Sequence, residues 1–112
     1  MSIKTKKIGS AIAREIGVIL NEEARNEILK NVSITDVTVD SDLTFARVYF
    51  MTHLTDHDMV EKELNEASSF IRTSLARKLN LRSTPELHFV YDKSVDFRER
   101  IDEVIEKINE GE

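Results

Sequence analysis

The sequence predicts an α+β domain in which helices pack against a small three-stranded sheet. In some segments apolar residues recur every three or four positions, as on one face of a helix. In three others they alternate with polar residues, as in a strand. Glycine and proline are scarce, with three and one in 112 residues, which favours long helices and few tight turns. This length fits one domain spanning residues 1–112.

The first helix is predicted from about Ile8 to Arg25. One of its faces collects apolar side chains: Ile12, Ile16, Ile19 and Leu20. Ser10 suits the N-terminal cap because its hydroxyl can accept a hydrogen bond from a free backbone N–H. Gly17 costs this helix about 1 kcal/mol relative to alanine, so we interpret it as the site of a close packing contact. Residues 1–7 are then expected to be a flexible basic N-terminus.

Two strands are predicted next, at residues 32–39 and 43–52. The alternation slips at Asp36, which indicates a β-bulge or a bend. The turn-forming cluster at residues 40–42 is short, so the two strands are expected to pair as an antiparallel hairpin. In the second strand one face carries Ala46, Val48 and Phe50, and the other carries Phe45, Arg47, Tyr49 and Met51.

A pair of helices should follow the hairpin. The first starts near Asp58, with Asp56 or Asp58 as its cap. We predict an interhelical kink at Ala67, Ser68 and Ser69, because serine competes for backbone hydrogen bonds and forms helices weakly. The second helix resumes by Phe70.

The C-terminal part predicts a third strand and a last helix. Pro85 forces Thr84 into an extended conformation, after which Leu87, Phe89 and Tyr91 alternate with polar residues. Ser94 can cap the last helix, and residues 109–112 are expected to be a flexible end. The apolar stripe of this helix is formed by Phe97, Ile101, Val104, Ile105 and Ile108.

Composition and motifs exclude several classes of protein. The chain has no cysteine, which rules out disulfides and thiolate metal sites, and no apolar run approaches the ~20 residues of a membrane span. We therefore expect a cytoplasmic protein with no membrane partner. No phosphate-binding loop, dinucleotide-binding glycine motif or zinc-protease motif occurs, so neither an enzyme nor a cofactor is expected. His53 and His57 lie in a predicted loop and cap, where surface histidines are favoured over metal ligands.

The charge is unevenly distributed. The net charge of −5 argues against a polyanionic partner, but residues 72–82 carry four basic groups and no acid, whereas residues 31–71 carry two basic and eight acidic groups. The candidate RNA contacts are the basic residues of this stretch and of the N-terminus: Arg72, Arg77, Lys78, Arg82, Lys4, Lys6, Lys7 and Arg14. Alternatively, these side chains border the core and extend their charged ends into solvent.

Aromatic side chains offer a weaker indication. Phe45, Tyr49 and Tyr91 would serve as base-stacking groups if they lay on an exposed sheet face. A domain of this size needs nearly every large apolar residue for its core, so core packing is expected for most of them.

Several segments, taken together and in order, resemble the ribosome-binding factor A family. Residues 42–49 are similar to its second-strand signature. Phe70-Ile71-Arg72, Leu75-Ala76 and Leu79-Asn80-Leu81-Arg82 are similar to its third helix. Residues 85–89, followed by Asp92 and Ser94, are similar to its third strand and the exit from it. The resemblance runs in register from about Ile8 to Ile105, and the combination is far more specific than any one segment.

The resemblance implies a type-II KH-like fold: helix, two strands, two helices with a kink between them, a strand and a C-terminal helix. In this family an Ala-x-Gly kink replaces the usual G-x-x-G loop, and Ser69 stands here where the family has glycine. It also implies a monomer that binds the immature small (30S) ribosomal subunit at the 5′-terminal helix region of its 16S rRNA. Such a factor supports late rRNA processing, subunit maturation and growth in the cold.

A second hypothesis comes from a different class of function. The acidic stretches suit a protein-interaction or regulatory domain that does not bind RNA. Salt dependence distinguishes the two, because binding to phosphates weakens steeply as salt is added.

Overall fold

The computed structural model describes residues 3–81, 83–96, 101 and 105. Its elements, in chain order, are α1 (Ile3–Val18), the π-helical turn η1 (Ile19–Glu23), α2 (Glu27–Lys30), β1 (Val32–Val39), β2 (Phe45–Thr52), α3 (His57–Glu66), α4 (Ser68–Lys78) and β3 (Glu86–Tyr91). This order agrees with the predicted one from the first helix to the third strand, except that the first helix ends at Val18 instead of Arg25 and that η1 and the short α2 were not predicted. The predicted α+β class with a three-stranded sheet is therefore confirmed.

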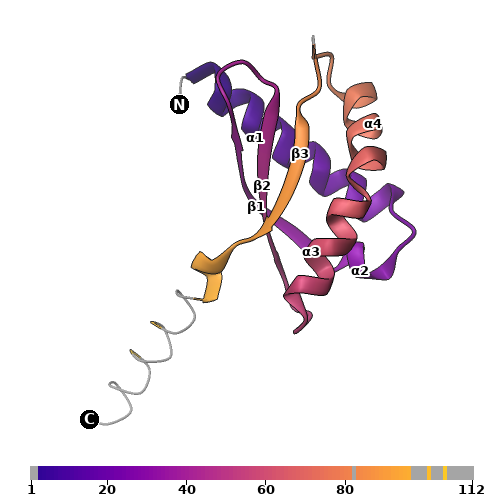
Figure 1. The fold of residues 1–112 in the computed structure, drawn as a ribbon, viewed down its shortest axis with the longest axis vertical. Coiled ribbons are helices and arrows are strands. Elements are labelled where there is room, and N and C mark those ends of the chain that lie inside the picture. The colour runs from indigo at the N-terminus through magenta and orange to yellow at the C-terminus, as the bar shows by residue number, and fades with distance from the viewer. Residues whose placement is uncertain (1–2, 82, 97–100, 102–104, 106–112) are drawn as a thin grey trace.

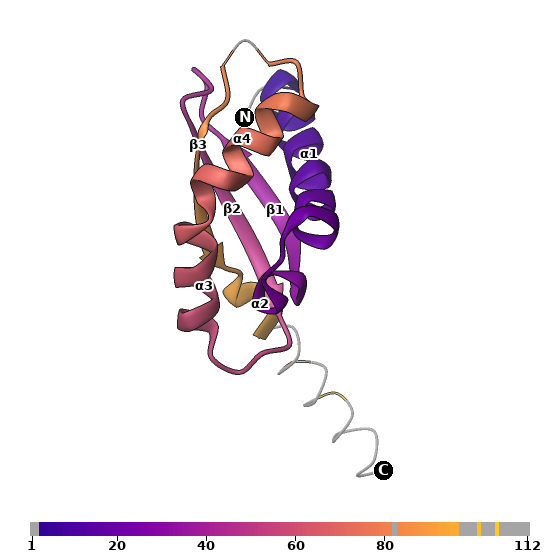
Figure 2. The ribbon, with the colours of Figure 1, turned by 90° about the vertical axis from the view of Figure 1, so that its right-hand side faces the viewer.

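The sheet has the strand order β1-β2-β3, with β2 in the centre. β1 and β2 are antiparallel, as the short turn predicted, and the register shifts between Ile34 and Asp36, which confirms the bulge. β3 runs parallel to β2. Figure 1 and Figure 2 together show α1, α3 and α4 on one side of the sheet. We call the other side the open face; its central column is Phe45, Arg47, Tyr49 and Met51 of β2.

The core lies between the inner sheet face and the helices. Every residue of the first predicted apolar stripe is buried, as are the inward-facing residues of β2. The largest fully buried side chains are Phe50, Phe89, Ile12, Ile16, Ile19, Leu20, Leu64, Ile71 and Leu75. The alternating and helical patterns of the sequence thus identify the core correctly, because each element has only one face on which to bury apolar area.

α1 starts earlier than the sequence pattern predicted. Residues 3–7, expected to be a flexible N-terminus, are helical, and Ser10 lies inside the helix instead of capping it. Thr5 and Gly9 are both buried and continue the face of Ile12 toward the N-terminus. Neither residue is strongly apolar, so the periodicity could not be followed through them.

The close helix–sheet contact occurs at Gly9 and not at Gly17. A Cβ added at Gly9 would lie 2.9 Å from the carbonyl oxygen of Val37 on β1. A Cβ added at Gly17 would meet no atom within 4 Å, so the interpretation of Gly17 as a packing site is wrong. The absence of a side chain at Gly9 therefore sets how closely α1 approaches β1.

The predicted helix break lies at Ala67. This residue separates α3 from α4 with φ −86° and ψ 0°, and its N–H donates to the carbonyl oxygens of Glu63 and Leu64, both at 3.1 Å. α4 resumes at Ser68, two residues earlier than predicted. Asp56 caps α3 by accepting a hydrogen bond from the Met59 N–H at 3.0 Å.

Side chains of α3 cover the outer edge of β3. The Asn65 amide donates to the Phe89 carbonyl oxygen at 3.1 Å and accepts from the Phe89 N–H at 3.0 Å. Glu61 Oε2 accepts from the Tyr91 N–H at 3.2 Å. Asn65 thereby takes the place that a neighbouring strand would occupy, which protects an otherwise exposed sheet edge.

After β3, Asp92 caps the next helical turn in place of Ser94. Its carboxylate accepts from the Ser94 N–H at 3.0 Å, and residues 93–96 are helical. Of the predicted stripe of the last helix, Ile101 and Ile105 are described and lie 43% and 51% exposed. The other stripe residues Phe97, Val104 and Ile108, and the predicted flexible end at 109–112, lie outside the described residues.

The β1–β2 turn is organised by one carboxylate. Asp40 accepts hydrogen bonds from the N–H groups of Thr44 and Phe45 and from the Thr44 hydroxyl, at 2.9–3.1 Å. Desolvation raises the pKa of Asp40, but the hydrogen bonds that its carboxylate accepts from Phe45 and Thr44 outweigh it, and the net pKa is lowered. Leu43, at φ 61°, provides the left-handed residue of the turn.

We predict opposite effects for alanine at the two glycines of α1. Gly9→Ala should lower the free energy of unfolding by about 1–2 kcal/mol, because the new methyl group overlaps the Val37 carbonyl oxygen. Gly17→Ala should raise it by about 0.5–1 kcal/mol, because alanine is the better helix former and the site has room. Urea unfolding of both variants measures this, and stabilisation by both would contradict the close contact at Gly9.

We also predict an acid-dependent contribution from Asp40. A lowered folded-state pKa means that the ionised carboxylate stabilises the fold above the ordinary aspartate pKa of about 4. This stabilisation should be lost as the pH falls from there through the lower folded-state value. Urea unfolding of the wild type and Asp40→Asn over this range should show a stability difference that shrinks with acidification. A difference that does not change with pH would refute this role of the charge.

Candidate nucleic-acid interface

Three of the predicted RNA contacts lie exposed on α1: Lys6, Lys7 and Arg14. The buried face of α1 includes Ile12 and Ile16, and at 100° per residue Lys7 and Arg14 point to the opposite side. Residues 1–14 contain four basic groups and no acidic group, so the part of α1 up to Arg14 carries only positive side chains. The side chain of Lys4 lies outside the described part of the chain.

Of the α4 residues, Arg72 and Lys78 have partners inside the protein. The Arg72 guanidinium donates twice to the Thr84 carbonyl oxygen, from Nε at 3.2 Å and from Nη2 at 2.8 Å. Lys78 Nζ lies 3.5 Å from Glu23 Oε1, with 29% of the lysine side chain exposed. These two cations fasten α4 to its neighbours, an arrangement that neither the RNA-contact prediction nor the alternative of charged ends extended into solvent had described.

Among the described cations of α4, Arg77 is the one that is exposed to solvent and is not held by another group of the protein as Arg72 and Lys78 are. Together with Arg72, Thr73, Ala76 and Thr84 it lines an open cavity of about 520 Å³. Arg82, the fourth predicted contact in this stretch, lies outside the described residues.

The predicted basic residues form two groups and not one continuous surface. α1 and α4 contact each other. Figure 1 places the N-terminal turns of α1 and the C-terminal turns of α4 at the same end of the domain but on opposite sides of it. A polyanion long enough to touch both groups would therefore extend across the helical side at this end.

The open face carries further candidate residues that charge counting missed. Arg47 is exposed there, opposite Thr38 on β1 and His88 on β3. The rings of Phe45 and His88 stack with centroids 4.4 Å apart and planes at 27°. The alternation of β2 was the sequence signal for this group. Tyr91 is buried as expected, whereas Phe45 and Tyr49 are half-buried on the open face.

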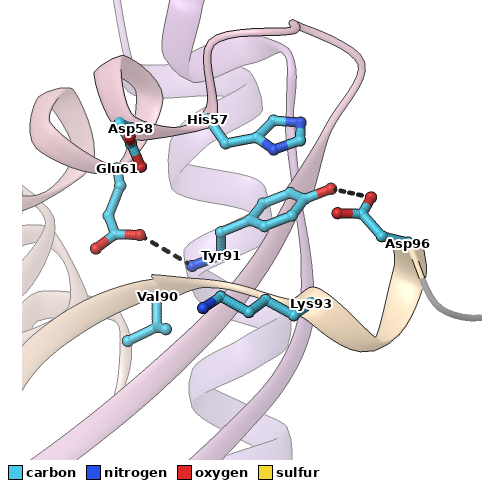
Figure 3. A pocket seen from close by; sticks show the side chains of 7 residues that line it. All are labelled: His57, Asp58, Glu61, Val90, Tyr91, Lys93 and Asp96. Atoms are coloured by element: carbon cyan, nitrogen blue, oxygen red, sulfur yellow. Dashed lines mark hydrogen bonds between the residues drawn. The ribbon is translucent and has the colours of Figure 1, made fainter.

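A larger cavity of about 590 Å³ lies between the start of α3 and the end of β3, as Figure 3 shows. The His57 ring stacks on Tyr91 with centroids 3.8 Å apart, and the Tyr91 hydroxyl donates to Asp96 Oδ1 at 2.8 Å. Asp58, Glu61 and Lys93 complete its wall. The stacking of His57 on Tyr91 and the hydrogen bond from the Tyr91 N–H to Glu61 hold the end of β3 against α3.

The described residues also bear on other kinds of site. They contain no group of three or more histidine, cysteine, aspartate or glutamate side chains placed to hold a metal ion. Among the same residues, no helix combines the length and the apolar character that crossing a membrane requires.

Comparison with known proteins identifies relatives over almost the whole chain. The family model described as ribosome-binding factor A matches residues 4–105. The ribosome-binding factor A of Enterococcus faecalis is 37% identical over 112 residues, which cover 97% of each chain. That of Legionella pneumophila (strain Lens) is 36% identical over 107 residues, covering 95% of this chain and 87% of the relative.

Solved structures agree in fold. The crystal structure of ribosome-binding factor A from Thermus thermophilus superimposes with a TM-score of 0.71 at 17% identity, covering 78% of this chain and 94% of that one. The solution structure of a putative ribosome binding factor A from Thermotoga maritima gives 0.68 at 24% identity, covering 80% and 88%. A Thermus thermophilus homology model fitted into the map of a 30S complex gives 0.61 at 19% identity, covering 84% and 97%.

The sequence matches extend over nearly the full length of both partners, and the solved structures superimpose over most of this chain. The type-II KH-like fold implied by the resemblance is thus the observed one from α1 to β3, while its C-terminal helix lies largely outside the described residues. The chain belongs to the ribosome-binding factor A family.

Proposed function

We propose that this protein binds the immature small ribosomal subunit and assists its maturation. The observation that carries the proposal is membership of the ribosome-binding factor A family over residues 4–105. A Thermus thermophilus protein of the same fold is described in a complex with the 30S subunit. On this proposal the chain acts by binding, in the cytoplasm, as a monomeric RNA-binding domain without a cofactor.

The proposed RNA surface is the helical side at the end where α1 begins. Lys6, Lys7 and Arg14 supply exposed positive charge on α1, and Arg77 supplies it on α4. A chain with a net charge of −5 meets a polyanion best through such local clusters, because they keep the phosphates away from its acidic stretches. Lys4 and Arg82 are proposed to extend the same surface.

Arg72 and Lys78 are proposed to have a different role from that of the exposed cations. Their contacts with Thr84 and Glu23 position the C-terminal end of α4 and the loop that follows it. They are proposed to shape the RNA surface and to add to its positive electrostatic potential, while Arg77 contacts phosphate directly. Replacing them would disturb the fold as well as the charge, so they are poor choices for a binding test.

The RNA target is proposed to be the 5′-terminal helix region of 16S rRNA. Helical RNA presents phosphates and 2′-hydroxyls across a wide, shallow minor groove, which suits cationic side chains projecting from helices. Binding there is proposed to support late rRNA processing and growth in the cold. The G-x-x-G loop is absent from the sequence, so the usual KH groove for single-stranded nucleotides is not part of the proposal.

We predict that Lys7→Gln, Arg14→Gln and Arg77→Gln together weaken association with small subunits and flatten its dependence on salt. Each lost phosphate contact should reduce the slope of log affinity against log salt by about one unit, so the triple variant should lose about two to three units. Binding of labelled protein to purified small subunits at several salt concentrations measures both quantities. Sucrose-gradient sedimentation of lysate tests the same association in the cell.

The matched control is Lys30→Gln, Lys62→Gln and Lys93→Gln, which removes the same charge from α2, α3 and the turn after β3. It should retain most of the affinity and slope, and thermal melts should show that both variants are folded. An affinity that does not change with salt concentration would favour the protein-interaction hypothesis over RNA contact. Equal losses of affinity in the triple variant and in the control would show that binding depends only on the net charge of the protein.

A further inference from the structure

The open face combines aromatic rings with one central cation. Phe45 and Tyr49 lie half-buried in the central column, on either side of the exposed Arg47. The His88 ring stacks on Phe45 and widens the aromatic surface toward β3. Neither α1, α3 nor α4 covers this face, as Figure 2 shows.

Carboxylates flank this column on both sides. Asp36 on β1 lies opposite Tyr49, and Glu86 on β3 lies opposite Phe45. Asp40 follows the end of β1, where its N–H donates to the Phe45 carbonyl oxygen. Asp92 follows the end of β3, and its carboxylate accepts the Thr35 hydroxyl across the face at 2.6 Å.

The charge of the open face is therefore opposite to that of the basic helical surface. The described strands hold two carboxylates, Asp36 and Glu86, against one cation, Arg47; just beyond the strand ends, Asp40 and Asp92 add two carboxylates and Lys93 adds one cation. RNA phosphates would be repelled here, whereas a cationic chain would be attracted. Carboxylates beside aromatic rings suit the guanidinium group in particular, because it binds carboxylates through two parallel hydrogen bonds and stacks on rings.

We propose that the open face binds an extended, arginine-rich segment of another protein. Its arginine side chains stack on Phe45, His88 and Tyr49 and pair with Asp36 and Glu86. β2 is eight residues long, so at about 3.3 Å per residue an extended segment of about eight residues runs its full length. The proposal does not depend on the proposed RNA surface, and it allows both partners to be bound at once on opposite sides of the sheet.

The test uses a fluorescent peptide of about eight residues in which arginine and serine alternate, with a glutamine-for-arginine peptide as the control ligand. Asp36→Asn with Glu86→Gln should weaken binding of the arginine peptide by about three- to tenfold, since two exposed ion pairs are lost. Arg47→Gln should tighten it by about two- to fivefold, because the opposing charge is removed. Fluorescence anisotropy measures both changes.

The matched control is Glu22→Gln with Glu66→Gln, which removes the same charge from exposed positions on η1 and α3. It should leave the affinity within about twofold of the wild type. Thermal melts should show that every variant is folded. The proposal is overturned if the wild type does not bind the arginine peptide, or if the Asp36/Glu86 variant binds as the control does.

Single-stranded oligouridine tests RNA as the alternative occupant, because its charge is opposite to that of the arginine peptide. If RNA occupies the open face, Arg47→Gln should weaken oligouridine binding and Asp36→Asn with Glu86→Gln should strengthen it. That pair of results would overturn the proposal in favour of an RNA surface. Small-subunit association is measured in parallel on the Asp36/Glu86 variant; it should be unchanged, so a failure of this proposal is distinguishable from a failure of the proposed function.

Discussion

The parallel pairing of β3 with β2 is the constraint on which the rest of the structure depends. Parallel neighbours cannot be joined by a tight turn, so the chain between them must cross over one side of the sheet. Here α3 and α4 form that crossover, and α1 packs beside α4. The apolar faces of α1, α3 and α4 are thereby collected on one side, and these three helices leave the other side of the sheet uncovered.

This arrangement also determines where the charged residues lie. The exposed cations Lys7, Arg14 and Arg77 come from helices and end up on the helical side, whereas Asp36 and Glu86 come from strands and lie around the open face. The helical side is mixed in charge, because η1, α2 and α3 contribute exposed carboxylates: Glu22, Glu27, Asp58 and Glu66. The parts of α1 and α4 that carry the cations can still approach RNA while the carboxylates of the open face are turned away from the phosphates.

Much of the fold could be predicted from the sequence because its local signals agree with the tertiary structure. The bulge near Asp36, the break at Ala67 and the buried stripe from Ile12 to Leu20 each follow from patterns within a few residues. What could not be predicted depends on residues distant in sequence. The contact of Gly9 with Val37 depends on where β1 lies.

The candidate site shows the same limit. The basic residues could be found by counting charge, but the partners of Arg72 and Lys78 are a carbonyl oxygen beyond the end of α4 and a carboxylate in η1. No local spacing reveals such contacts. The stacking of Phe45 on His88 likewise requires the register between β2 and β3, which the alternation within each strand does not determine.

The closure of the β3 edge by Asn65 ties the solubility of the domain to the integrity of α3. An amide side chain occupies the hydrogen-bonding positions of Phe89 that another chain's backbone would otherwise fill. The sheet can therefore be extended at this edge only after α3 has locally unfolded. Conditions that loosen the crossover would expose an apolar strand and an unsatisfied edge together, the combination from which intermolecular β-sheet aggregation grows.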